Sequence, residues 1–181
     1  MAMFYIKKSV PLSIVASFDS FWSIPSFKIS EKIVQLMLSM SSKTEEKLII
    51  QTKNTEDSAL LAIQRNNLLS FVRSELEDRQ SLSYPPYKRF IKIKFQGNKI
   101  ETMQVKEFLA KHFQEYEPEI FSGFLSKQKG LYVVNSLIRI DIKNWSYSEL
   151  SPHSKIDEDL VKKLLALPPE FEIFVDPDDL L

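Results

Sequence analysis

The 181-residue chain contains no cysteine, which excludes disulfide bonds, thiolate nucleophiles and cysteine-ligated zinc. It has only three glycines, and none belongs to a glycine-rich loop of the kind that cradles nucleotide phosphates. An excess of charge is also absent, because 24 basic residues balance 24 acidic ones. The whole-chain charge therefore predicts neither a nucleic-acid nor a membrane partner, and any such signal must be local.

Long apolar runs are missing as well, since none approaches the roughly 18 residues that a membrane-spanning helix needs. The first twenty residues resemble a secretory signal in having two lysines before an apolar run, but Pro11 interrupts that run and no small-residue cleavage site follows. We therefore expect a cytoplasmic chain without a membrane partner. The hydrophobic content of 44% is sufficient for a folded core.

Residues for catalysis or metal binding are sparse. His112 and His153 have no metal-ligand spacing to a pair of carboxylates. The acidic segment 176–179, DPDD, could hold a hard cation, although such a cluster is more simply a solvated surface. No set of nucleophile, base and orienting residue is apparent. We predict no catalytic residue, no metal and no cofactor.

The first half of the chain reads as an α/β unit. Short apolar runs at 12–18 and 47–52 predict buried strands, and apolar residues spaced by three and four predict a helix over 28–40 between them. Strand, helix and strand in this order indicate a parallel crossover. Asn54 or Thr55 is expected to cap the next helix, and a further helix is expected over 68–80.

A sharp boundary follows at Tyr84, Pro85 and Pro86. The residue before a proline is pushed away from helical geometry, so this segment should end the helix and start an extended chain. We predict two domains, 1–83 and 84–181. In the second, strands at 88–95, 120–124, 132–143 and 171–175 and helices at 100–116 and 157–167 give the order βαββαβ, which is typical of a ferredoxin-like α+β domain.

Basic side chains alternate with apolar ones along two of these strands. In KRFIKIKF, Lys92 and Lys94 point to the face opposite Ile91 and Ile93, together with Lys88 and Phe90. In LIRIDIK, the isoleucines at 138, 140 and 142 should face the helices, whereas Arg139, Asp141 and Lys143 should face outward. If the strands are neighbours, a basic platform with an aromatic ring results, which suits a phosphate backbone and an unstacked base.

The alternative is an ordinary solvated sheet face, because antiparallel sheets with one wet side alternate in this way. Regional charge favours DNA: between residues 88 and 111, seven basic residues stand against two acidic ones. The DNA-binding candidates are six cationic residues of the two strands: Lys88, Arg89, Lys92, Lys94, Arg139 and Lys143.

Most of the chain resembles the PriA family of bacterial replication-restart helicases. The segment ELEDRQSLSYPPYKRFIKIKF is similar to the junction at which the family's E-L-x-x-R helix meets a Y-P-P-aromatic turn. Upstream, FDSFWSIPSFKISEKIVQLML is similar to the family's D-F-R-x-x-E-R and F-Q-L-L stretch, and KLIIQT to its V-L-I-Q-T strand. The ending FEIFVDPDDLL is similar to the closing D-V-D-P.

The resemblance implies that residues 1–83 are a partial RecA-like second helicase lobe. Residues from Tyr84 onward would be a C-terminal domain that binds single-stranded or forked DNA, the single-stranded DNA-binding protein and other primosome proteins. The family's ATP-contacting G-R-A-G-R box is replaced by SKTEE, with Lys43 and Glu46 at the arginine positions. A glutamate there repels a phosphate instead of attracting it, so the lobe should be degenerate and the chain should not be an ATPase.

The leading hypothesis is thus a PriA-like accessory chain that binds DNA through its C-terminal domain and lacks a motor. Two alternatives stay open. The chain could be one piece of a split 3'-5' DNA helicase whose motor residues lie on another polypeptide. It could also be a protein-docking scaffold without DNA binding, because half of a lobe should expose apolar surface.

Overall fold

The structure is a computed structural model that describes residues 8–24, 26–123, 130–146 and 155–180. It is a mixed α/β structure with two separate sheets. The chain divides into two compact units, Met1–Glu77 and Asp78–Leu181, called unit 1 and unit 2 below. The division falls within helix α3, Leu68–Ser81.

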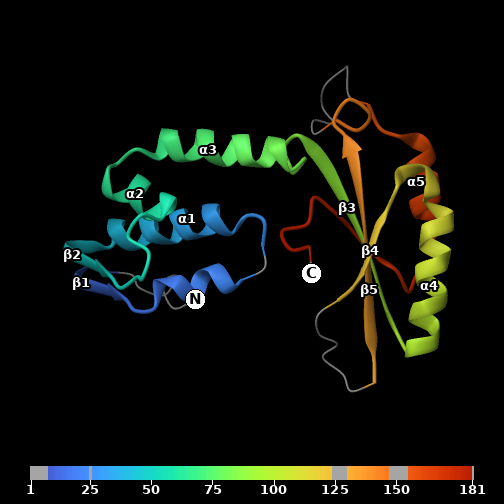
Figure 1. The fold of residues 1–181 in the computed structure, drawn as a ribbon, viewed down its shortest axis with the longest axis horizontal. Coiled ribbons are helices and arrows are strands. Elements are labelled where there is room, and N and C mark those ends of the chain that lie inside the picture. The colour runs from blue at the N-terminus through green and yellow to red at the C-terminus, as the bar shows by residue number, and fades with distance from the viewer. Residues whose placement is uncertain (1–7, 25, 124–129, 147–154, 181) are drawn as a thin grey trace. The chain divides into compact units, whose positions relative to one another are not determined.

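Unit 1 is built on two parallel strands, β1 (Val10–Val15) and β2 (Thr44–Ile50), connected by helix α1 (Ile29–Ser42) (Figure 1). The predicted parallel crossover is therefore confirmed. A 3-10 helix, η2 (Phe18–Ser23), follows β1, and helix α2 (Ser58–Gln64) precedes α3. The buried core of this unit consists of Val15, Phe18, Ile33, Val34, Met37, Ala59, Ala62 and Phe71.

The prediction that the first strand is buried is wrong. Leu12 and Ile14 are 49% and 61% exposed, and Ile49, which pairs with Ile14, is 38% exposed. Neighbouring positions on a strand point to opposite faces, and only the face that carries Val15 joins the core with α1. The strand also ends at Val15, because the chain enters η2 at Phe18.

Two local predictions in unit 1 need correction. Asp57 caps α2, accepting hydrogen bonds from the amides of Ala59 (3.0 Å) and Leu60 (3.2 Å). The predicted cap Asn54 instead accepts from the amide of Glu56 at 3.2 Å, within a turn. Strand β2 begins at Thr44, three residues before the predicted start at 47, because the backbone of this polar segment pairs with β1 while Glu45 and Glu46 stay exposed.

Unit 2 contains the predicted order of strands and helices. These elements are β3 (Lys88–Gly97), α4 (Lys99–His112), the 3-10 helix η3 (Gln114–Tyr116), β4 (Glu119–Ser122), β5 (Tyr132–Asp141), α5 (Glu158–Leu165) and β6 (Glu172–Val175). The strands form one antiparallel sheet in the order β4-β5-β3-β6. Helices α4 and α5 lie on the same side of this sheet (Figure 1).

The core of unit 2 lies between the sheet and these helices. Ile91 and Ile93 of β3 meet Leu109 and Phe113, all fully buried, together with Leu160 of α5. Further members of this core are Val134, Ile138, Ile140, Trp145 and Leu164. We call the opposite side of the sheet the outer face.

Local signals fix where α3 ends and α4 begins. Helix α3 ends at Ser81, just before Tyr84, Pro85 and Pro86, as predicted. The Asn98 side chain caps α4 by accepting from the amides of Ile100 (2.9 Å) and Glu101 (3.0 Å), and Glu101 accepts in return from the Asn98 amide at 2.8 Å. Within the described ranges, no helix is long and apolar enough to cross a membrane.

Replacing Leu109 by alanine should lower the free energy of unfolding by about 2–5 kcal/mol, because it leaves a cavity between α4 and the sheet. The matched control is Met103→Ala on the same helix, where the side chain is 60% exposed and the expected change is within about 0.5 kcal/mol. Urea unfolding followed by circular dichroism measures both. Equal effects of the two substitutions would contradict the assignment of the core.

The carboxylate of Asp19 makes the stability of unit 1 depend on pH. The backbone amide of Lys53 donates to its carboxylate at 3.0 Å and the Thr52 hydroxyl at 2.9 Å, which lowers the pKa of Asp19 below its ordinary 3.8. Because the pKa of Asp19 is lower in the folded chain than in the unfolded one, the ionised carboxylate stabilises the fold above the unfolded-state pKa. This contribution is lost as the pH falls through the folded-state pKa. Asp19→Asn should therefore lower Tm at about pH 6 more than at about pH 3. A pH-independent difference would contradict this.

Candidate nucleic-acid interface

The pairing of β3 with β5 brings the predicted cationic residues together. Lys88 lies opposite Asp141, Phe90 opposite Arg139, and Lys94 opposite Asn135. Opposed residues of antiparallel strands share a face, so Lys88, Lys92, Lys94 and Arg139 all lie on the outer face. The prediction that the two strands are neighbours is confirmed.

Three of these cations are paired with carboxylates of the same face. Lys88 Nζ lies 2.8 Å from Asp141 Oδ1, and Lys94 Nζ lies 3.0 Å from Glu172 Oε2. Arg139 Nη2 lies 3.0 Å from Glu119 Oε2. The exposed fraction of the side chain is 30% for both lysines and 31% for the arginine. Exposed ion pairs contribute about 0–1 kcal/mol, so a competing anion can replace these partners at little cost.

Lys92 differs from the other cations because it is only 6% exposed. Its ammonium group donates to the backbone carbonyl of Asp179 at 3.1 Å. Burial lowers the pKa of Lys92, and the negative charge of Asp179 partly opposes that shift. The predicted platform of uncovered lysines is thus wrong for this residue, because the chain after β6 passes over it.

The predicted aromatic of the platform is also covered. Phe90 is fully buried, with the Tyr84 ring edge-on at 5.5 Å and the Arg139 guanidinium 5.5 Å from its centroid. It is therefore not accessible to a stacking base. Phe121 of β4 and Phe174 of β6 share the outer face through their pairing with Asn135 and Lys92, and Phe174 is 41% exposed.

Sequence reasoning missed these two phenylalanines. The signal was the same alternation that revealed the lysines, present in the short segments EIFS and EIFV. Those segments have four residues each, and their faces become clear only when the register of β4 and β6 is known.

Arg89 lies on the side of β3 that faces away from Lys88 and Lys92. Its Nε is 3.0 Å from Asp176 Oδ2, its Nη1 donates to the carbonyl of Ser146 at 2.8 Å, and its guanidinium lies 5.7 Å from the Trp145 ring. The side chain is 9% exposed. The geometry gives Arg89 a bracing role at the end of the sheet, and DNA contact by this residue stays a prediction.

Lys143 lies outside the sheet, because β5 ends two residues before it. The strand that was predicted to reach it ends at Asp141, whose carbonyl accepts from the amides of Asn144 (2.8 Å) and Trp145 (3.1 Å) and turns the chain. Ile142, predicted to face the helices, is consequently 39% exposed. Lys143 is exposed in this turn.

The candidates for metal binding that the structure describes do not assemble a site. His112 Nε2 donates to the carbonyl of Lys163 (3.2 Å) and the ring stacks on Phe108, while His153 lies outside the described residues. Asp176 of the acidic segment is engaged by Arg89. Among the residues that the structure describes, no group of three or more potential ligands is close enough to hold a metal ion.

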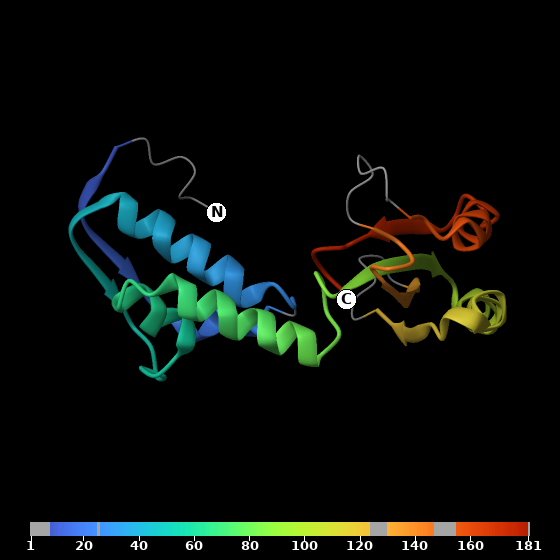
Figure 2. The same ribbon diagram turned by 90° about the horizontal axis from the view of Figure 1, so that it is seen from above.

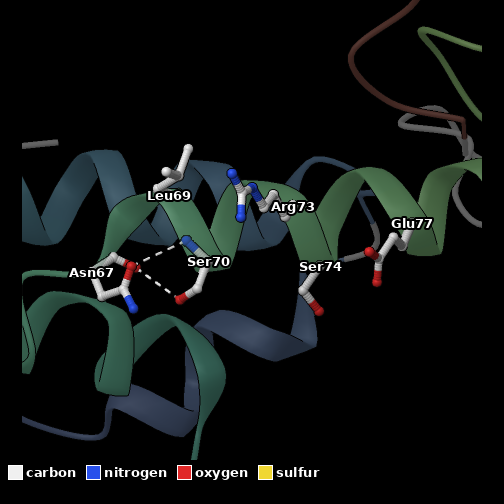
Figure 3. A pocket seen from close by; sticks show the side chains of 6 residues that line it. All are labelled: Asn67, Leu69, Ser70, Arg73, Ser74 and Glu77. Atoms are coloured by element: carbon white, nitrogen blue, oxygen red, sulfur yellow. Dashed lines mark hydrogen bonds between the residues drawn. The ribbon is translucent and has the colours of Figure 1, made fainter.

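A hollow of about 310 Å³ lies elsewhere, along α3 (Figure 3). It is lined by Asn67, Leu69, Ser70, Arg73, Ser74 and Glu77. Leu69 and Arg73 point one way from the helix, and Ser74 and Glu77 point the other way. Because these side chains diverge, they do not present converging groups to a ligand.

Replacing Arg89 by lysine should lower the free energy of unfolding by about 1–3 kcal/mol. Lysine keeps the charge but cannot reach Asp176 and Ser146 at once with the fork of donors that the guanidinium provides. Thermal and urea unfolding measure the loss, and Lys99→Arg at an exposed position is the control. An Arg89→Lys variant as stable as the native chain would overturn the bracing role.

Comparison with known proteins supports the resemblance. No family model matches the chain. Curated sequences named replication restart protein PriA do: that of Borreliella burgdorferi is 30% identical over 104 residues, covering 54% of this chain and 16% of the relative. That of Thermotoga maritima is 32% identical over 89 residues (46% and 12%), and that of Chlamydia muridarum is 29% identical over 94 (49% and 12%).

The chain thus spans less than a fifth of the length of these relatives. Relatives from separate bacterial lineages match with similar identity, each over about half of this chain. The predicted resemblance to PriA, the bacterial replication restart protein, is confirmed, although each match covers about half of this chain and the prediction covered most of it.

Proposed function

We propose that this chain acts in bacterial replication restart by binding single-stranded or forked DNA through the outer face of unit 2. The observation that carries the proposal is the placement of Lys88, Lys94 and Arg139, each partly exposed, on one face of a PriA-like chain. In this proposal unit 2 is a ferredoxin-like C-terminal domain and unit 1 is the end of a RecA-like helicase lobe. Other primosome proteins and the single-stranded DNA-binding protein are the partners we propose.

The proposed mode of binding is exchange of anions. Each carboxylate now beside a cation would give way to a DNA phosphate, which carries the same single negative charge and releases condensed counterions from the strand when it binds a cation. Phe174, paired with Lys92 and 41% exposed, is the proposed stacking surface for a base. Because the face carries nearly as many acidic as basic groups, binding should be weak at physiological salt and should tighten steeply at low salt.

The proposal includes no ATP hydrolysis by the chain alone. Lys43 follows α1 and Glu46 lies in β2, at the positions where the resemblance implies phosphate-binding arginines. The Glu46 side chain is exposed and acidic, so it would repel a triphosphate. A chain with this replacement can contribute DNA contacts without a motor.

Charge changes at the outer face provide the test. Lys88→Glu with Lys94→Glu should weaken binding of a fluorescent single-stranded oligonucleotide and lower the magnitude of the slope of log affinity against log salt by about two. Lys99→Glu with Lys111→Glu, exposed residues of α4, is the charge-matched control and should change affinity little. Anisotropy titrations between about 50 mM and about 200 mM salt provide the measurement.

The reciprocal change sharpens this experiment. Asp141→Asn with Glu172→Gln removes the carboxylates that face the same two lysines and should tighten binding. Opposite effects of the lysine and carboxylate variants would locate DNA on this face. Equal binding by all variants would reject the outer face as the DNA site.

A second candidate, protein docking, is favoured by one observation in unit 1. Leu12, Ile14 and Ile49 lie on the same side of the β1-β2 pair and are 49%, 61% and 38% exposed. Parallel sheets are ordinarily covered on both faces, so this apolar side suits a protein partner. Light scattering after size-exclusion chromatography would support this role if Ile14→Lys abolished an association seen with the native chain.

A further inference from the structure

The chain after β6 turns onto the outer face of unit 2. We call residues 176–180 the tail. Figure 2 shows the tail on the side of the sheet opposite the two helices of unit 2, and Figure 1 shows the same arrangement from another direction. The tail has the sequence DPDDL and so carries three carboxylates within four residues.

Asp176 anchors the start of the tail. Its amide donates to the carbonyl of Phe90 at 2.7 Å, and its Oδ1 accepts from the Phe90 amide at 3.1 Å. Its Oδ2 lies 3.0 Å from Arg89 Nε. Asp176 also has a left-handed backbone, with φ of 50°, which redirects the chain away from the line of β6. The tail therefore leaves β6 from a fixed point beside β3.

Three residues later, the tail covers a cation. The carbonyl of Asp179 accepts from Lys92 Nζ at 3.1 Å, and Lys92 is 6% exposed although it lies on the outer face. Asp179 also acts on Lys92 through its charge. Lys92 lies on the same strand face as Lys88 and Lys94, so the tail occupies the middle of the row of β3 lysines.

The chemistry of the tail is that of a short polyanion. Closely spaced carboxylates and a carbonyl acceptor present to lysines what successive phosphates of a nucleic acid would present. We propose that the tail is an intramolecular competitor of DNA: it occupies Lys92 in the free chain and is displaced when nucleic acid binds the outer face. This inference rests on the proposed function and adds a means of regulating it.

The expected size of the effect follows from the contact. The tail is part of the same chain as Lys92, so it competes with DNA at a high effective concentration. Breaking its hydrogen bond to the charged Lys92 should cost DNA about tenfold in affinity. Because the competition is between anions, neutralising the tail should also relieve part of it.

The main test is a chain truncated after Pro177, which keeps the anchor Asp176. It should bind a fluorescent oligothymidine about tenfold more tightly than the full chain. Asp178→Asn with Asp179→Asn, which leaves the chain end in place, should give a smaller gain. Glu107→Gln with Glu170→Gln removes two exposed carboxylates elsewhere and should leave the affinity unchanged. Circular dichroism melts verify that each variant is folded.

A second readout does not involve DNA. Lys92 should react with an amine-acetylating reagent several-fold faster in the truncated chain, whereas the exposed Lys99 should react at the same rate, as quantified by peptide mass spectrometry. An unchanged rate at Lys92 would show that the tail does not cover it and would overturn the inference.

The outcomes separate the two proposals. If the full chain binds DNA and truncation leaves its affinity unchanged, the tail is not a competitor, while the proposed function stands. If neither chain binds DNA at low salt, both proposals fail, whatever the reactivity of Lys92. Tighter DNA binding together with faster acetylation of Lys92 supports both.

Discussion

The antiparallel register between β3 and β5 is the constraint on which the rest of unit 2 depends. Ten consecutive pairs, from Lys88 with Asp141 to Gly97 with Tyr132, fix which side chains lie toward α4 and α5 and which lie outward. A shift of one residue would exchange the two sets and place Lys92 in the apolar core. The burial of Ile91 and Ile93 beneath the helices therefore also determines the composition of the outer face.

The outer face is electrostatically balanced. Lys88, Lys94 and Arg139 are each held by a carboxylate from another strand or strand end, and Lys92 by the carbonyl of Asp179. Such a face has little net field at long range, because each positive charge is partly cancelled within about 3 Å, well inside the screening length at physiological salt. DNA binding here would depend on short-range exchange of partners more than on long-range attraction.

The two units differ in how completely this chain covers their sheets. In unit 2 a four-stranded sheet has helices on one side and a partly covered outer face on the other. In unit 1 two parallel strands pack on α1 with one side only, which leaves Ile14 and Ile49 exposed. A parallel pair of strands usually belongs to a larger sheet that is covered on both sides, whereas one side of this pair is exposed.

Elements with strong local signals were predictable. The spacing of apolar residues gave α1 within two residues, the boundary at Tyr84, Pro85 and Pro86 gave the end of α3 within one, and alternation gave the faces of β3. Local prediction failed where side chains had competing partners: Asn54 bonds within a turn and leaves the cap of α2 to Asp57. The end of β5 at Asp141 was also missed, because the turn that stops it is made by backbone hydrogen bonds that the sequence does not specify.

The sequence by itself determined the order of elements, the alternation of lysines with isoleucines on β3, and the resemblance to PriA. These depend on neighbours along the chain, whose periodicity is visible without coordinates. Only the tertiary structure decided that Phe90 and Lys92 are covered, that Arg89 braces Asp176, and that acidic residues from β4, β6 and the end of β5 face the cations. Those contacts join residues up to 87 positions apart, and their formation depends on strand order and on the path of the tail.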